Sequence, residues 1–175
     1  VFPNPTDNLT PRYCPIRDEL VKAFNSRNLT PTKAGSFKPA SDLIRSENRL
    51  SDLFTDEDMA AIYENYRAPV WVKAPSMLHS REDAFLSSLD LETFGNSDLL
   101  TLARNDGKNS DNFVKLVCGF SDDKLVEVYK KIADASSRGL VTYKGCYRPI
   151  FRTVEGSHET PERLYFDAGV SSGGS

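Results

Sequence analysis

Residues 120–139 read FSDDKLVEVYKKIADASSRG, and the interpretation of the whole chain starts from this stretch. Ser121 supplies a hydroxyl that can accept a bond from an N–H of a first helical turn. Two aspartates follow it, where the positive end of a helix dipole favours carboxylates. Gly139 stands at the far end, where a residue at positive φ commonly closes a helix. The apolar side chains between them recur three and four residues apart: Leu125, Val128, Tyr129 and Ile132. The stretch therefore predicts an amphipathic helix, which needs a hydrophobic body to lie on.

The same periodicity and capping signals predict six more short helices, over residues 15–28, 41–54, 55–66, 80–89, 96–104 and 110–119. Two prolines bracket Trp71 and its valine neighbours, so we expect an extended segment there with the tryptophan as a core anchor. Residues 140–154 are rich in β-branched and aromatic types and predict one bent strand or a strand pair. Residues 155–162 read as a polar loop, and residues 163–167 as a last short strand. We therefore predict a mainly α fold of about seven short helices with a small β patch near the C-terminus.

Length and composition are consistent with one globular domain. The chain has 175 residues, enough to bury a core without disulfides or metals. Its longest apolar runs are only a few residues, so we expect no membrane span. Three cysteines give no readable disulfide framework and weakly favour a reducing compartment. Because Asn8 and Asn28 begin glycosylation sequons, the localisation stays open.

The two ends of the chain differ from its middle. Residues 1–14 contain three prolines and no periodicity, which predicts an extended arm. Residues 15–168 form the predicted helical domain, and the Gly/Ser-rich residues 169–175 predict a flexible tail. Residues 1–40 carry six basic and three acidic side chains, whereas residues 41–134 carry eleven and eighteen. This asymmetry suggests that the arm of one copy docks on the body of another.

The sequence contains no motif with an established catalytic mechanism. It has no phosphate-binding loop, no dinucleotide-binding glycine pattern, no HExxH and no GxSxG. Two histidines, His79 and His158, and no CxxC pair leave little for a metal site. The run 105–112, NDGKNSDN, lacks ligands at the positions that a calcium loop needs. Residues 157–159, Ser-His-Glu, adjoin in a polar loop, whereas catalytic triads converge from distant positions. We therefore expect no cofactor, metal or catalytic residue, and we lean against an enzyme.

One pattern near the C-terminus points to a ligand. No acidic residue occurs from 135 to 154, while basic and aromatic side chains alternate there. On an unbroken strand the even-numbered cations would share one face, and such a strip can hold phosphates or stack bases. The alternative is an exposed strand face with its aromatic residues packed on the core. The candidate residues for binding a polyanion are Arg138, Tyr143, Lys144, Tyr147, Arg148 and Arg152.

Three functions follow as expectations. The first is a non-enzymatic assembly subunit whose arms contact neighbouring copies, with a coat- or nucleocapsid-like organisation and a local strip for nucleic acid or another polyanion. The second is a monomeric protein-binding module, such as a secreted effector or regulator. The third is a small enzyme whose site is assembled from distant residues.

Overall fold

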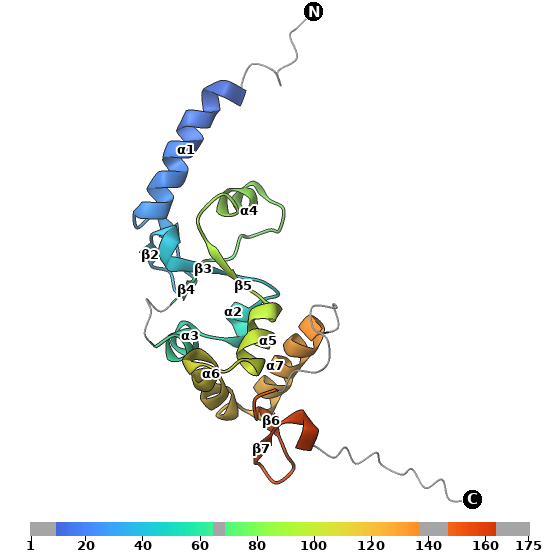
Figure 1. The fold of residues 1–175 in the computed structure, drawn as a ribbon. Coiled ribbons are helices and arrows are strands. Elements are labelled where there is room, and N and C mark those ends of the chain that lie inside the picture. The colour runs from blue at the N-terminus through green and yellow to red at the C-terminus, as the bar shows by residue number, and fades with distance from the viewer. Residues whose placement is uncertain (1–9, 65–68, 137–146, 164–175) are drawn as a thin grey trace, which may run out of the picture. The chain divides into compact units, whose positions relative to one another are not determined.

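The computed structural model describes residues 10–64, 69–136 and 147–163. This part of the chain contains seven α-helices and a small strand pair near the C-terminus, which confirms the predicted mainly α class (Figure 1). The chain forms two compact units, residues 1–98 and 99–175, which are described in turn.

The first unit begins with helix α1, Thr10–Ser26. We predicted that this helix would start at Pro15, so residues 10–14 are helical where an extended arm was expected. A proline at position 11 is tolerated because the first N–H groups of a helix have no intrahelical acceptor. The remaining part of the predicted arm, residues 1–9, lies outside the described residues.

A three-stranded parallel sheet supplies much of the core of the first unit. Its spatial order is β4 (Val70–Trp71), β3 (Leu43–Ser46) and β5 (Glu92–Phe94). The central strand corrects our prediction of a helix over residues 41–54. Leu43 and Ile44 are adjacent and are both buried, which suits a strand covered on both faces and does not suit the single stripe of a surface helix.

Short helices make the crossovers that parallel strands require. Helices α2 (Leu50–Leu53) and α3 (Asp56–Ile62) connect β3 to β4, and α4 (Arg81–Leu86) lies between β4 and β5. Thr55 and Asp58 form the predicted capping box at the start of α3. Ser80 caps α4 as expected, by accepting a bond from the Asp83 N–H.

A small hairpin precedes the sheet, within residues 28–40. It pairs β1 (Thr30–Pro31) with β2 (Phe37–Lys38) in antiparallel fashion. Gly35 takes a φ of 87° in the connecting turn, a left-handed conformation that a glycine adopts without strain. Thr32 then bridges to Val72, just after β4, so the hairpin is joined to the sheet.

Trp71 anchors the core of the first unit, as predicted. Its side chain is 1% exposed, and its indole N–H donates to the Phe54 carbonyl at 2.7 Å. Its backbone N–H donates to the carboxylate of Asp56 at 2.8 Å. The ring meets Phe94 edge-on, with 6.0 Å between centroids. Trp71 therefore ties β4 to the α2–α3 segment and to β5.

Helices dominate the second unit. Helix α5 (Asn96–Arg104) spans the division of the chain after Asp98, so most of it belongs to the second unit. It is followed by α6 (Lys108–Cys118) and α7 (Asp122–Ala135). Helix α7 confirms the prediction from which the sequence analysis started: Ser121 accepts a bond from the Lys124 N–H, and one stripe of the helix is buried. The buried residues of that stripe are Leu125, Val128, Ile132 and Ala135.

The β patch near the C-terminus is a hairpin of β6 (Phe151–Arg152) and β7 (His158–Glu159). The predicted strand over residues 140–154 is only partly present, because residues 147–150 are irregular and residues 140–146 lie outside the description. Strand β7 lies in what we read as a polar loop. A 3-10 helix, η3 (Pro161–Arg163), ends the described part, and the rest of the predicted last strand lies beyond it.

Candidate functional site

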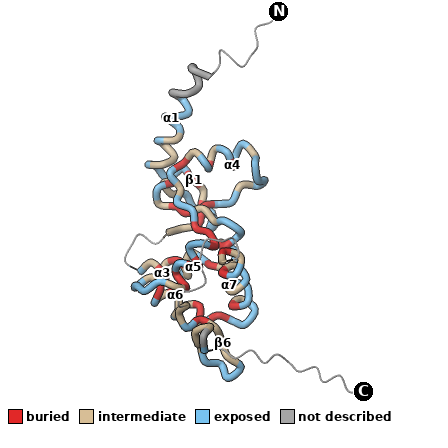
Figure 2. Tube along the Cα trace, turned by 45° about the vertical axis from the view of Figure 1, so that its right-hand side comes forward, coloured by how far each residue is buried: buried red, intermediate tan, exposed pale blue. Residues whose placement is uncertain are grey.

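A groove on the first unit lies between α1 and α4, and we call it the α1–α4 groove. It encloses about 420 Å³. The residues that line it are Ile16, Arg17, Leu20, Arg81, Ala84 and Phe85. Ile16 is 60% exposed and Leu20 is 49% exposed, which is unusual for side chains on the apolar stripe of a helix. Figure 2 shows this part of α1 in the exposed colour.

Specific contacts beneath the groove hold its two walls together. The ring of Phe24 on α1 meets the ring of Phe85 on α4 edge-on, with centroids 5.0 Å apart. The Asn25 side chain donates to the Asp90 carboxylate at 2.8 Å and accepts from the Asp90 N–H at 3.0 Å. These contacts join α1 to α4 and to the segment that follows α4.

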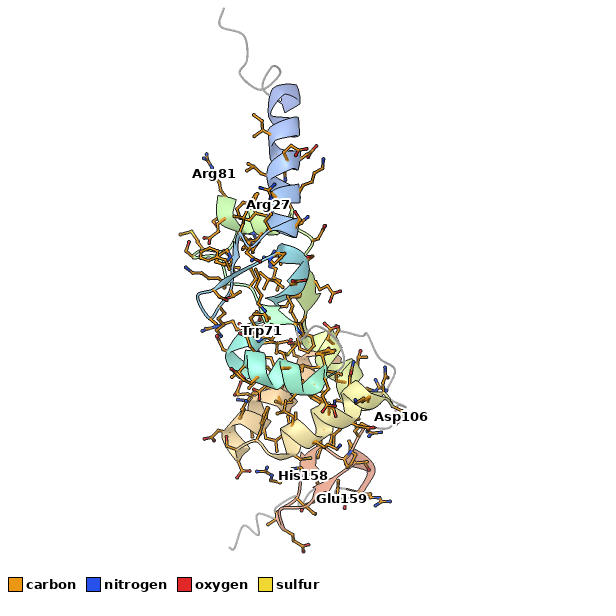
Figure 3. All side chains as sticks on the ribbon, turned by 90° about the vertical axis from the view of Figure 1, so that its left-hand side faces the viewer. Arg27, Trp71, Arg81, Asp106, His158 and Glu159 are labelled. Atoms are coloured by element: carbon orange, nitrogen blue, oxygen red, sulfur yellow. The ribbon has the colours of Figure 1, made fainter. Side chains whose placement is uncertain are left out.

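The groove carries positive charge above an apolar floor. Arg17 and Arg81 line it, and no acidic side chain does. Figure 3 shows Arg81 extending from α4 at the surface, and neither arginine makes a hydrogen bond or ion pair within the described part of the chain. Such a groove suits an apolar segment that also carries a carboxylate.

A second cavity, the sheet-edge pocket, lies where strands β3 and β4 end. It encloses about 510 Å³. It is lined by Arg45, Ser46, Asn48, Arg49, Ser51, Asp52, Val72, Ala74, Pro75, Leu78 and Leu86. Ligands of open α/β sheets bind outside the carboxyl ends of parallel strands, so the pocket lies where a ligand site is expected.

Two ion-pair clusters hold the polar side of the sheet-edge pocket. Arg45 pairs with Asp83 and donates to the Ser87 hydroxyl at 2.7 Å. The His79 N–H donates to the Asp83 carboxylate at 2.9 Å, and this bond and the Arg45 charge lower the pKa of Asp83. This cluster fixes the Arg45 guanidinium against the start of α4.

The other cluster centres on Asp52. Its carboxylate accepts from the Lys33 ammonium at 2.8 Å and from Arg49 Nε at 2.9 Å. These two cations, Lys33 first, lower the pKa of Asp52. One carboxylate shared by two cations leaves this side of the pocket positive.

Three of the six residues of the predicted polyanion strip lie in the described part of the chain: Tyr147, Arg148 and Arg152. Arg138, Tyr143 and Lys144 lie outside the described residues. Arg148 pairs with Asp106 and Asp111, and its side chain is 27% exposed.

Arg152 has partners of its own. It pairs with Asp122 and donates to the carbonyls of Cys118 at 3.1 Å and Phe120 at 2.8 Å. A phosphate would have to compete with these carboxylates and carbonyls, so polyanion binding stays a prediction.

Tyr147 packs among neighbours of the second unit. Its ring lies edge-on to Phe151 at 5.7 Å, and the Arg104 guanidinium lies 5.4 Å from its centroid. Because the backbone around it is irregular, the single-face alignment that an unbroken strand would give is not formed at residues 147–150.

The described part of the chain contains neither a cluster of metal-ligating side chains nor a helix suited to a membrane. Over the described ranges, no group of three or more His, Cys, Asp or Glu side chains is placed to hold a metal ion. Among the same residues, no helix combines the length and the apolar character needed to cross a bilayer. Comparisons with protein-family models, with curated protein sequences and with solved structures find no match to this chain.

Proposed function

We propose that this chain is a non-enzymatic assembly subunit, and that neighbouring copies bind each other through the α1–α4 groove. The observation that carries the proposal is the exposure of Ile16 and Leu20 over an apolar groove. Taking such a side chain from full exposure to full burial contributes about 1.5–3 kcal/mol, and these half-exposed residues would each gain roughly half of that. A partner that covers both residues therefore gains enough to offset part of the entropy of association.

The occupant that we propose is the segment Leu164-Tyr165-Phe166-Asp167 of another copy. It supplies three adjacent apolar side chains for the floor of the groove and one carboxylate for Arg17 and Arg81. These residues lie outside the described part of the chain, so the proposal rests on their sequence and on the complementary groove. The segment belongs to the predicted domain, residues 15–168, and adjoins the tail, residues 169–175, that we expect to contact neighbouring copies.

Light scattering after size-exclusion chromatography tests this proposal. The 19.5 kDa chain should show a mass above that of the monomer, and the mass should fall on dilution. Leu20→Glu should give monomers, because it introduces a charge onto the apolar floor. Val126→Glu is the matched control: Val126 is also on a helix, at 46% exposure, but is remote from the groove in sequence and belongs to the second unit.

Two outcomes would contradict the proposal. A wild-type chain that is monomeric at every concentration would favour the monomeric protein-binding module. A Leu20→Glu chain that keeps the wild-type mass would show that copies associate elsewhere. Far-ultraviolet circular dichroism of both variants checks that a lower mass in light scattering does not result from unfolding.

A further inference from the structure

The sheet-edge pocket has the size and construction of a small-molecule site. Its volume of about 510 Å³ falls within the usual range for such sites, roughly 300–1,000 Å³. It belongs wholly to the first unit. A ligand site there is complete within one copy of the chain.

One wall of the pocket is apolar. Five side chains form this wall: Val72, Ala74, Pro75, Leu78 and Leu86. Val72 and Leu86 are buried, whereas Leu78 is 71% exposed and stands at the rim. A ligand with an apolar body would cover the exposed leucine and lie on the buried pair.

The other lining residues are polar, and they include two arginines and one aspartate. Hydroxyl and amide groups come from Ser46, Ser51 and Asn48. Arg49 is the most available cation, because its side chain is 89% exposed. Its Nε donates to Asp52, and its two terminal nitrogens make no hydrogen bond within the described residues. Those nitrogens can bind an anionic group in a bidentate manner.

Unusual backbone conformations are concentrated around this pocket. In the described ranges, three residues other than glycine have positive φ: Asn48 at 50°, Arg49 at 60° and His79 at 60°. Two of them line the pocket, and the third directly follows Leu78. Such conformations cost about 1–3 kcal/mol each and gather at ligand sites, where a side chain must be held in a particular direction.

We propose that the sheet-edge pocket binds an organic anion that has an apolar body and one carboxylate, sulfonate or phosphate group. The apolar body lies against Leu78, Val72 and Leu86. The anionic group binds the terminal nitrogens of Arg49. The ion pair between Arg45 and Asp83 keeps the base of the pocket in place.

The test uses anilinonaphthalene sulfonate, an aromatic anion whose fluorescence rises on binding. N-phenyl-1-naphthylamine is its uncharged counterpart. Trp71, the only tryptophan, adjoins Val72 in the pocket wall, so probe bound there should accept energy from it. Arg49→Gln and Leu78→Ser are the pocket variants. Arg81→Gln and Leu20→Ser test the α1–α4 groove as the alternative site, and Val126→Ser, at an exposed position of α7, is the matched control.

The expected pattern separates charge from apolar contact. Arg49→Gln should lower the affinity for the anionic probe about tenfold or more and leave the affinity for the uncharged probe unchanged. Leu78→Ser should weaken the binding of both probes, and Val126→Ser should bind both as the wild type does. Octanoate should displace the anionic probe, whereas inorganic phosphate at the same concentration should not.

Three results would overturn the inference: no binding of the anionic probe to the wild type, wild-type binding by both pocket variants, or loss of binding in the groove variants alone. The last result would place the probe in the α1–α4 groove. Since the pocket experiment needs no oligomer, its failure is distinguishable from failure of the proposed assembly.

Discussion

The Tyr129 hydroxyl on α7 joins the C-terminal hairpin to the helix by accepting a bond from the Arg152 N–H at 3.0 Å. The same hydroxyl donates to the carbonyl of Ile150 at 2.7 Å. Ile150 is fully buried, and the Tyr129 ring stacks on Phe151 at 5.0 Å. One side chain thus fixes three consecutive residues of the segment that enters β6.

Tyr129→Phe should lower the free energy of unfolding by about 1–2 kcal/mol, because it removes two hydrogen bonds while keeping the ring stacked. Urea denaturation of the purified chain measures the loss. Tyr147→Phe is the matched control: this tyrosine also packs on Phe151, but its hydroxyl makes no hydrogen bond within the described residues. Equal stability of the two variants would argue against a role for the Tyr129 hydroxyl.

Arg152→Met should lower the free energy of unfolding by about 1–3 kcal/mol. The substitution keeps an apolar stem but removes the Arg152 donor to the carbonyls of Cys118, at the end of α6, and of Phe120, between α6 and α7. Asp122→Asn provides the comparison, because it removes the ion pair and the favourable charge in the first turn of α7 but keeps both bonds from Arg152 to the carbonyls. Asp122 is 83% exposed, so its loss should cost less than about 1 kcal/mol. A larger effect of Asp122→Asn than of Arg152→Met in urea denaturation would contradict this account.

The helices were predictable where local signals agreed. Helix α7 carries a cap, carboxylates in its first turn and a regular stripe, all within one stretch of sequence. Strand β3 was mistaken for a helix because its role depends on β4 and β5, which lie far along the chain and are only two and three residues long. Short parallel strands leave no periodicity in the sequence.

The candidate site was harder to predict than the fold. Ile16 and Leu20 share an apolar stripe with Phe24, yet Phe24 and Val21 pack against the core cluster while Ile16 and Leu20 are exposed. Periodicity shows which residues share a face and does not show how far a partner element extends along it. The sheet-edge pocket combines residues 45–52 with residues 72–86, and the turns that join them carry no recognised motif.

Alkaline pH should destabilise the first unit through Tyr63. Burial, with the charges of Asp98 and Glu92, raises its pKa to about 12. In the unfolded chain a tyrosine ionises near pH 10, so between about pH 10 and 12 the folded state holds the extra proton. The free energy of unfolding should therefore fall as the pH rises through this window. Because the side chain is partly exposed, we expect a loss of about 1–2 kcal/mol.

Tyr63→Phe isolates this contribution. Urea denaturation at pH 9 and at pH 11.5 should show a smaller loss of stability for the variant than for the wild type. Tyr129, whose pKa burial also raises, contributes equally to both chains and cancels in the comparison. The same pH dependence in both chains would show that Tyr63 ionises normally in the folded state.

A peptide with the sequence of residues 163–169, RLYFDAG, should bind the α1–α4 groove in trans. We expect a Kd of roughly 10–100 μM, because a flexible peptide of this size loses much of its contact energy to ordering. Fluorescence anisotropy of a labelled peptide measures the affinity. Leu20→Glu should abolish binding, since it places a charge on the apolar floor.

The double variant Arg17→Glu, Arg81→Glu should weaken binding at least fivefold, since it repels the Asp167 carboxylate. A peptide with Tyr165 and Phe166 changed to alanine should not bind, and one with Asp167→Asn should lose its sensitivity to the arginine variants. If the wild-type peptide bound all protein variants equally, another surface would have to receive this segment.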